Sequence, residues 1–137
     1  MRVYIDTNIL VDLVLARKDF LSDAQRLFAL GYANEIQLLV SALSFVNTLY
    51  IGKKYKFSIE EVKSKLKIIA DFADVVDLRG QNVVDMLDSN WKDYEDATQF
   101  RSALDEQADC IITRNKKDYT NSSIEVLTPP EFLLRIK

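Results

Sequence analysis

The sequence predicts an α/β fold of three layers, α/β/α, in which helices cover both faces of a central parallel sheet of about five strands. Short apolar runs that read as buried strands alternate with longer stretches whose apolar residues recur at helical spacing. Alternation of this kind is typical of strands joined by crossover helices, so the strands are expected to be parallel. With only 3 Gly and 2 Pro in 137 residues, the chain shows no linker, which favours one domain over residues 1–137.

The first predicted strand covers residues 2–5. A helix follows it, and its inward face carries Ile9, Leu10, Leu13 and Val14. A second helix is predicted to begin at Ser22, because Ser22-Asp23-Ala24-Gln25 fits a capping box, and to end near Gly31. Residues 38–40 are the second predicted strand.

Two helices are predicted between the second strand and the third. The first has an apolar stripe made of Leu43, Val46, Leu49 and Tyr50. The second begins at a capping box, Ser58-Ile59-Glu60-Glu61, and its inward residues are Val62, Leu66, Ile69 and Phe72. The third strand is then expected over residues 75–78.

The last third of the chain continues the alternation. A short helix is predicted over about residues 81–88, and Asp96 opens another whose inward face is Ala97, Phe100, Leu104 and Ala108. Strands are expected over residues 110–112 and 124–127. A closing helix follows, with Thr128 as its cap, proline in its first turn, and Phe132, Leu133 and Ile136 turned inward.

Acidic residues follow two of the predicted strands directly. Asp6 comes after the first strand, and Asp118 comes after the strand at residues 110–112. Loops at the carboxyl ends of parallel strands lie on one edge of the sheet, where open α/β folds place their chemistry. Asp96 is brought there by the start of its helix. Carboxylates gathered in this way repel one another unless a cation lies between them.

The composition restricts the chemistry of such a site. The chain has no His, the commonest general base and transition-metal ligand, so the ligands are expected to be oxygen atoms and the ion to be a hard cation, Mg²⁺ or Mn²⁺. A single Cys permits no internal disulfide, and no apolar run is long enough to span a membrane. These features predict a cytoplasmic protein without a membrane partner.

Charge is distributed unevenly along the chain. Residues 53–67 hold six lysines and two glutamates, a net charge of +4, whereas residues 85–109 hold eight acids and two basic residues, a net charge of −6. An acidic pole beside a basic one suits a metal site next to a surface for a polyanion. Solvated faces of ordinary helices would give the same runs.

Three segments together resemble the PIN domain, a metal-dependent ribonuclease fold found in the toxins of many bacterial toxin–antitoxin pairs. They are the opening residues 3–13, the run Glu95-Asp96-Ala97, and residues 111–119. The resemblance covers nearly the whole chain and implies a PIN-like fold. It also implies that Asp6, Asp96 and Asp118 are the catalytic and metal-binding residues, with Asn8 and Thr113 supporting them.

The sequence departs from the usual PIN pattern at two positions. Asn47 stands in the helix after the second strand, where the family usually has Glu, and Asn115 stands where many relatives carry Asp. Asp93 and Glu95, beside Asp96, offer compensating carboxylates. The resemblance is closest to a PIN subgroup that has Asn in that helix.

The resemblance implies a metal-dependent endoribonuclease acting on single-stranded RNA, with a small antitoxin as partner and homodimers as a further expectation. Basic residues are expected to guide the RNA, namely Lys53, Lys54, Lys56, Arg114, Lys116 and Lys117, while Trp91, Tyr94 or Tyr119 would stack on a base. The alternative is a PIN module that binds RNA or protein without cleaving. A haloacid-dehalogenase-type phosphotransferase is disfavoured because Asn8 occupies the place of its second Asp, and a response-regulator receiver because the paired acids and later Lys of that fold are missing.

Overall fold

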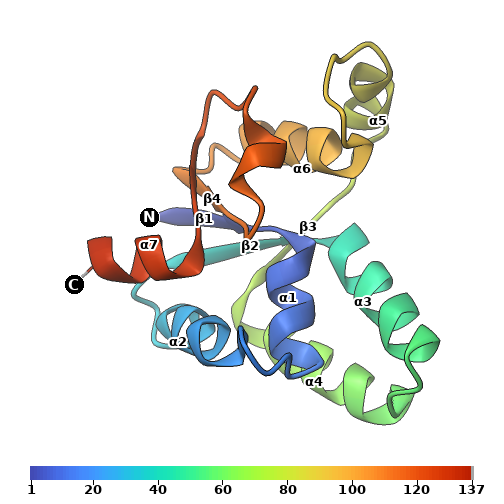
Figure 1. Ribbon diagram of the computed structural model, residues 1–137, viewed down its shortest axis with the longest axis vertical. Helices are drawn as coiled ribbons and strands as arrows, with labels where there is room; N and C mark the ends of the chain where they lie inside the picture. Colours follow the sequence, from blue (N-terminus) through green and yellow to red (C-terminus); the bar gives the residue numbers. More distant parts are fainter. Residues whose placement is uncertain (137) are drawn as a thin grey trace.

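The computed structural model describes residues 1–136, and in this part of the chain five strands form one sheet in the order β3-β2-β1-β4-β5 (Figure 1). The strands are β1 Arg2–Ile5, β2 Gln37–Ser41, β3 Asp74–Val76, β4 Cys110–Ile112 and β5 Glu125–Leu127. All neighbouring strands are parallel, and Val3 of β1 lies opposite Leu38 of β2 and Cys110 of β4. The predicted parallel sheet is confirmed.

Helices cover both faces of the sheet (Figure 1). They are α1 Thr7–Val14, α2 Leu21–Tyr32, α3 Ala42–Lys54, α4 Ile59–Phe72, α5 Gly80–Leu87, α6 Tyr94–Asp105 and α7 Pro129–Arg135, with a 3₁₀ turn η1 at Lys116–Tyr119. Helices α1, α2, α4 and α7 pack on one face, and α6 packs on the other with η1. The three-layer α/β/α arrangement is therefore also confirmed. No helix within residues 1–136 is both long and apolar enough to cross a membrane.

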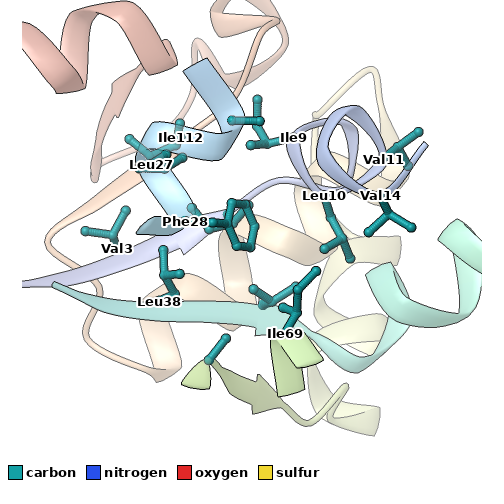
Figure 2. Packing of buried hydrophobic residues seen from close by; sticks show 14 of the residues in the cluster. Val3, Ile9, Leu10, Val11, Val14, Leu27, Phe28, Leu38, Ile69 and Ile112 are labelled. Atoms are coloured by element: carbon teal, nitrogen blue, oxygen red, sulfur yellow. The ribbon is translucent and has the colours of Figure 1, made fainter. Parts of the chain in front are cut away.

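Successive strand residues point to opposite faces of the sheet and so supply two separate cores. The larger core joins strand residues to α1 and α2, as Figure 2 shows for Val3, Leu38, Ile112, Ile9, Leu10, Leu27 and Phe28. The smaller core lies under α6 and contains Tyr4, Leu39, Ile111, Phe100 and Tyr119. Because every central strand is buried on both faces, its sequence is almost continuously apolar.

Helix α2 differs from the sequence prediction at both ends. It begins at Leu21, and its N-cap residue Phe20 makes no side-chain capping bond within the described residues, so the capping box predicted at Ser22 is wrong. The helix also runs past Gly31 to Tyr32. A Cβ atom on Gly31 would lie 2.2 Å from Leu38 Cδ1. Glycine is needed there because α2 packs closely on β2, and not because the helix ends.

Helix α3 turns a different face inward from the one predicted. Val46 is 61% exposed and Tyr50 is 66% exposed, so these two members of the predicted apolar stripe are wrong, whereas Leu49 does pack against the larger core. The buried residues of the helix are Ser44, Thr48 and Gly52. Small side chains allow α3 to approach α1 and α4 closely, and a Cβ on Gly52 would lie 3.3 Å from Val62 Cγ2.

The remaining differences concern element ends. Strand β3 covers Asp74–Val76 and not residues 75–78. Helix α6 begins at Tyr94, two residues ahead of the predicted start at Asp96, and it ends at Asp105, so Ala108 lies outside it. Leu104, which was predicted to face inward, is 40% exposed. Ile136 follows the last turn of α7 and is 38% exposed. The predicted caps of α4 and α7 do form, since the Ser58 and Thr128 hydroxyls accept hydrogen bonds from Glu61 N and Glu131 N. Among the described residues, the return bond from the glutamate side chain that completes a capping box is present at α7 and not at α4.

Candidate metal centre

Asp6 occupies the junction between β1 and α1 and is only 4% exposed. Its Oδ1 accepts a hydrogen bond from Thr7 N at 2.8 Å, which makes it the N-cap of α1. Its Oδ2 accepts from Thr113 Oγ1 at 2.7 Å. Thr113 directly follows β4, the neighbour of β1 in the sheet, so the pairing of these strands brings the two side chains together.

Three further carboxylates lie beside this junction. Asp93, Asp96 and Asp118 each place an oxygen within 4.8 Å of the others. Asp93 caps α6 by accepting from Asp96 N at 2.9 Å, and Asp96 Oδ1 accepts from Tyr119 OH at 3.3 Å. The start of α6 and the turn η1 thus converge on one point, with Asp118 arriving from the residue before Tyr119.

A cavity of about 230 Å³ is lined by most of the residues that the sequence predicts to bind the metal or to support its ligands. Its walls include Asp6, Asn8, Asp93, Glu95, Asp96, Asn115 and Asp118. Within residues 1–136 the α3 side chain that reaches this cavity is Ile51, and Asn47 does not line it. Asp93, predicted only to support the site, belongs to the tightest carboxylate cluster, whereas Asp6 lies beside that cluster with both of its oxygens hydrogen-bonded.

The carboxylates disfavour one another's ionised forms. Burial, followed by the charges of Asp6, Asp93 and Asp118, raises the pKa of Asp96 to about 8. Burial also raises the pKa of Asp6 to about 6, against the opposing effect of its hydrogen bonds from Thr113 and Thr7. The pKa of the Tyr119 phenol is raised by burial and by both of these carboxylates. A cation among the carboxylates would remove this cost.

The donor set fits a hard divalent cation. The available donors are carboxylate and amide oxygens, which Mg²⁺ and Mn²⁺ prefer. In addition, Asn8 Oδ1 is buried and has no hydrogen-bond partner among the described residues. Since a buried acceptor without a partner costs free energy, an ion or ordered water near Asn8 would relieve it. The carboxylate cluster is therefore a candidate metal centre.

A buried polar network lies beneath the site, and the sequence analysis missed most of it. Thr7 Oγ1 is 2.7 Å from Ser44 Oγ, and it donates to Glu95 Oε1 at 2.9 Å. Gln99 Nε2 donates to Thr7 Oγ1 and Ser44 Oγ, and Tyr4 OH donates to Gln99 Oε1. Polar residues on α3 and α6 resemble a solvated helix face, so only the burial of these faces reveals the network.

The predicted RNA-binding residues lie outside the cavity walls within residues 1–136. Lys53, Lys54 and Lys117 are exposed, and Lys116 pairs with Glu131 at 3.1 Å. Arg114 donates two hydrogen bonds to the buried Asp12, at 2.7 and 3.2 Å, and so has a structural partner.

The predicted stacking aromatics differ in how they lie. Tyr119 is 2% exposed and therefore has no face open to a base. Trp91 packs against Phe100 and Tyr119, with ring centroids 5.1 and 5.6 Å away. Tyr94 is 65% exposed, so its ring is the most open to solvent of the three, while Trp91 is half-buried.

Comparison with known proteins agrees with this fold. The profile of the family described as PIN domain matches residues 2–117, and the chain belongs to the PIN domain family. It is 31% identical over 144 residues to Ribonuclease VapC1 of Aquifex aeolicus (strain VF5), covering 98% of this chain and 94% of that protein. The resemblance recognised in the sequence is confirmed. The placement in a subgroup with Asn at position 47 stays a prediction.

Solved structures show the same fold. A toxin–antitoxin complex from Klebsiella pneumoniae has a chain with a TM-score of 0.66 and 25% identity, covering 93% of this chain and 97% of that one. A chain of VapBC2 from Rickettsia felis, bound to a promoter DNA fragment, has a TM-score of 0.65 at 18% identity with the same coverage. Mycobacterium tuberculosis VapC20, described as a Sarcin-Ricin loop cleaving toxin, has a TM-score of 0.63 at 14% identity, covering 80% of this chain and 86% of that one.

Proposed function

We propose that this protein is a metal-dependent endoribonuclease that cleaves single-stranded RNA and acts as the toxin of a toxin–antitoxin pair. The observation that carries the proposal is the cluster of Asp93, Asp96 and Asp118 beside Asp6, inside one cavity of a PIN domain. The relative that is 31% identical over nearly all of both chains is named a ribonuclease, which supports this reaction class.

Asp93, Asp96 and Asp118 hold the cation, Mg²⁺ or Mn²⁺, and Tyr119 fixes one oxygen of Asp96 by hydrogen bonding. A divalent cation at this place supplies activation of water and offsets negative charge on the scissile phosphate. Asp6 adds negative charge at the back of the cavity, where Thr113 and the first turn of α1 hold it in place.

Glu95 accepts the proton of the attacking water. The chain has no His, and carboxylates are the bases that line this cavity in greatest number. Glu95 lines the cavity and is exposed, and the hydrogen bond from Thr7 Oγ1 fixes Oε1. Thr7 and the Gln99 amide behind it are therefore positioning residues for Glu95.

Asn47 stands where the PIN family usually has Glu. This difference favours a PIN module that does not cleave RNA only if the side chain at position 47 is needed as a metal ligand. Within residues 1–136, Asn47 does not line the cavity, whereas five carboxylates do, those of Asp6, Asp93, Glu95, Asp96 and Asp118. Because this number of carboxylates is sufficient to hold a divalent ion, we favour an active enzyme. Asn115 contributes its amide to the rim of the cavity.

RNA approaches over the exposed lysines on either side of the site. Lys53 and Lys54 end α3, while Lys116 and Lys117 lie in η1, directly before Asp118. Exposed lysines bind phosphates mainly by charge, so this binding should weaken as salt rises. Arg114 is the least available of the predicted contacts, because Asp12 occupies two of its donors.

An antitoxin docks in the apolar groove between α2 and α4. The groove has a volume of about 460 Å³, and Phe28, Tyr32, Ile68 and Phe72 are among its walls. Tyr32 is 72% exposed and Ile68 is 60% exposed, which suits the apolar face of an amphipathic partner helix. The relatives solved as toxin–antitoxin complexes support a partner of this kind. The exposed substitution Ile68→Lys is expected to weaken antitoxin binding in calorimetry.

Homodimers form through α3 and α5, which lie on one side of the molecule in Figure 1. These helices expose Val46, Tyr50, Val84 and Leu87, each at least 55% accessible. Exposed apolar side chains in this number are typical of a protein interface. Leu87→Lys is expected to shift the mass measured by light scattering from dimer to monomer.

Cleavage of labelled single-stranded RNA tests the proposed reaction. Purified protein is assayed with Mn²⁺, with Mg²⁺ and with EDTA, together with Asp96→Asn and the exposed control Asp88→Asn. Metal-dependent cleavage that Asp96→Asn abolishes and Asp88→Asn retains is the expected result. Absence of cleavage by the folded, antitoxin-free protein in both metals would instead support an RNA- or protein-binding module.

A further inference from the structure

A second cavity lies beside the metal centre and shares a wall with it. Its volume is about 400 Å³, within the range of roughly 300–1,000 Å³ that is usual for small-molecule sites. Its walls come from α1, from the start of α2 and from the first turn of α7. Helices α2 and α7 pack against each other (Figure 1). Asn115 lines both this cavity and the acidic one. A ligand spanning the two would therefore pass Asn115.

One wall of this cavity is an arginine–aromatic pair whose guanidinium group is held in place. The Arg114 guanidinium carbon lies 4.0 Å from the centre of the Phe20 ring. The buried Asp12 carboxylate holds the same guanidinium group by two hydrogen bonds. Phe20 nevertheless remains 41% exposed, and two prolines continue the apolar surface. An exposed aromatic ring with a pinned guanidinium group is a stacking platform of the kind that unpaired nucleobases use.

The charged residues that line this cavity are Asp12, Asp19, Asp23 and Arg114. Asp12 pairs with Arg114 at 2.7 Å and with Arg17 at 3.7 Å, and Asp23 lies 3.9 Å from Arg26, but within residues 1–136 neither Arg17 nor Arg26 lines the cavity. A phosphate requires net positive charge, which this acidic lining does not supply. A basic side chain stacked on Phe20 would lie beside the Arg114 guanidinium group and be repelled by it, whereas an uncharged nucleobase would not.

We propose that this cavity is a subsite for the unpaired nucleobase next to the scissile phosphate. The proposal rests on the proposed nuclease function and adds to it a determinant of sequence preference. The base stacks on the exposed part of Phe20 and Arg114, and the RNA backbone passes Asn115 into the acidic cavity.

The polar groups around the subsite select among the bases. Asp19 and Asp23 are carboxylates and can only accept hydrogen bonds. Adenine, cytosine and guanine each carry an exocyclic amino group with two donor hydrogens, whereas uracil has no amino group and donates from its Watson–Crick edge only through the ring N3–H. The subsite should therefore prefer amino-bearing bases to uracil by roughly tenfold in cleavage rate.

Two readouts on the intact protein test this subsite. The first is sequencing of the ends produced from a randomised single-stranded RNA library in Mn²⁺. The second is the shift of the Arg114 Nε–H and Asn115 amide NMR signals on titration with AMP, CMP, GMP or UMP. The variants are Phe20→Leu, which keeps an apolar side chain without a ring, and Asp23→Asn, with the exposed Asp71→Asn of α4 as the charge-matched control.

We expect AMP, CMP and GMP to shift both signals more than UMP does. Phe20→Leu should reduce these shifts severalfold, Asp23→Asn should reduce the preference against uracil at one flanking position, and Asp71→Asn should change neither. Cleavage with no base preference at a flanking position, and no nucleotide-induced shift, would overturn the subsite and leave the nuclease proposal standing.

Nucleotide shifts without any RNA cleavage would support the subsite and overturn the nuclease proposal. Shifts caused by N-acetyl-arginine amide and by no nucleotide would overturn the subsite in favour of a basic side chain from a protein partner.

Discussion

Thr113 Oγ1 donates a hydrogen bond to Asp6 Oδ2 across 2.7 Å, and this contact joins the ends of β4 and β1 beside the candidate metal centre. Both residues are buried, Thr113 completely. Asn115 N in turn donates to Thr113 Oγ1 at 3.1 Å, so one hydroxyl group fixes both the Asp6 carboxylate and the loop that leads to Asp118. Thr113 therefore organises the site without lining its cavity within the described residues.

Replacing Thr113 with Val removes this hydroxyl while keeping a similar shape. Thr113 Oγ1 anchors the loop that carries Asp118, one of the proposed ligands, as well as Asp6. Because residues that hold metal ligands in place typically contribute 10–100-fold in affinity, Thr113→Val is expected to weaken Mn²⁺ binding by about that factor in calorimetry. Thr113→Ser restores the hydroxyl and is expected to recover most of the affinity. Equal binding by Thr113→Val and the natural protein would show that the Asp6 contact does not position the site.

The stability of the metal-free protein should fall as pH rises. The pKa of Asp96 is about 8 in the folded state and near 3.8 in the unfolded chain, so the folded state holds this proton more tightly. Its stabilising contribution is complete below about pH 4 and is lost as pH rises through 8, by at most about 1.4 kcal/mol per pH unit.

Urea denaturation in EDTA from pH 5 to pH 8 measures this dependence. The natural protein should lose more stability over that interval than Asp96→Asn, which has no proton to lose, and Mn²⁺ should reverse the loss. Parallel curves for the two proteins would contradict the raised pKa of Asp96.

The hydrophobic pattern locates the buried strands, and strands that are parallel end at the same edge of the sheet. These two facts made the acidic part of this site predictable from the sequence. Asp6 and Asp118 could be placed together because each follows a buried strand and parallel strands end at one edge. The role of Asp93 was less visible, since an acid before a helix reads first as a cap, and here it is both a cap and a member of the carboxylate cluster.

The inward face of α3 could not be read from its sequence. Val46 and Tyr50 repeat at helical spacing as core residues do, yet the small polar face of Ser44 and Thr48 is the buried one. The reason is tertiary, because only small side chains permit the close approach of α3 to α1 and the hydrogen bond between Ser44 and Thr7.

Removing Arg114 should destabilise the fold. Asp12 is 1% exposed, and it would lose two hydrogen bonds and its nearest positive charge, keeping within residues 1–136 the ion pair with Arg17 at 3.7 Å. Breaking a buried pair in this way costs about 3 kcal/mol. Urea denaturation of Arg114→Met should show this loss, and the double variant Asp12→Asn with Arg114→Met should recover part of it. An unchanged midpoint for Arg114→Met would count against a structural role for the pair.

The two glycines Gly31 and Gly80 should respond differently to alanine. At Gly31 the added Cβ would lie 2.2 Å from Leu38 Cδ1, so Gly31→Ala is expected to destabilise by about 1–3 kcal/mol through overpacking. A Cβ added at Gly80 would meet no side chain of the described residues within 4 Å, so Gly80→Ala should be neutral or slightly stabilising. Thermal denaturation of the two variants gives the comparison, and similar melting temperatures would refute the close packing of α2 on β2.

Anomalous diffraction from crystals grown with Mn²⁺ is the most direct test of the central claim, which is that Asp93, Asp96 and Asp118 hold a divalent cation. We expect an anomalous peak within bonding distance of oxygens from these three residues, and its loss in crystals of Asp96→Asn. A Mn²⁺ peak elsewhere on the molecule, or none at saturating Mn²⁺, would contradict the metal centre and with it the proposed cleavage chemistry.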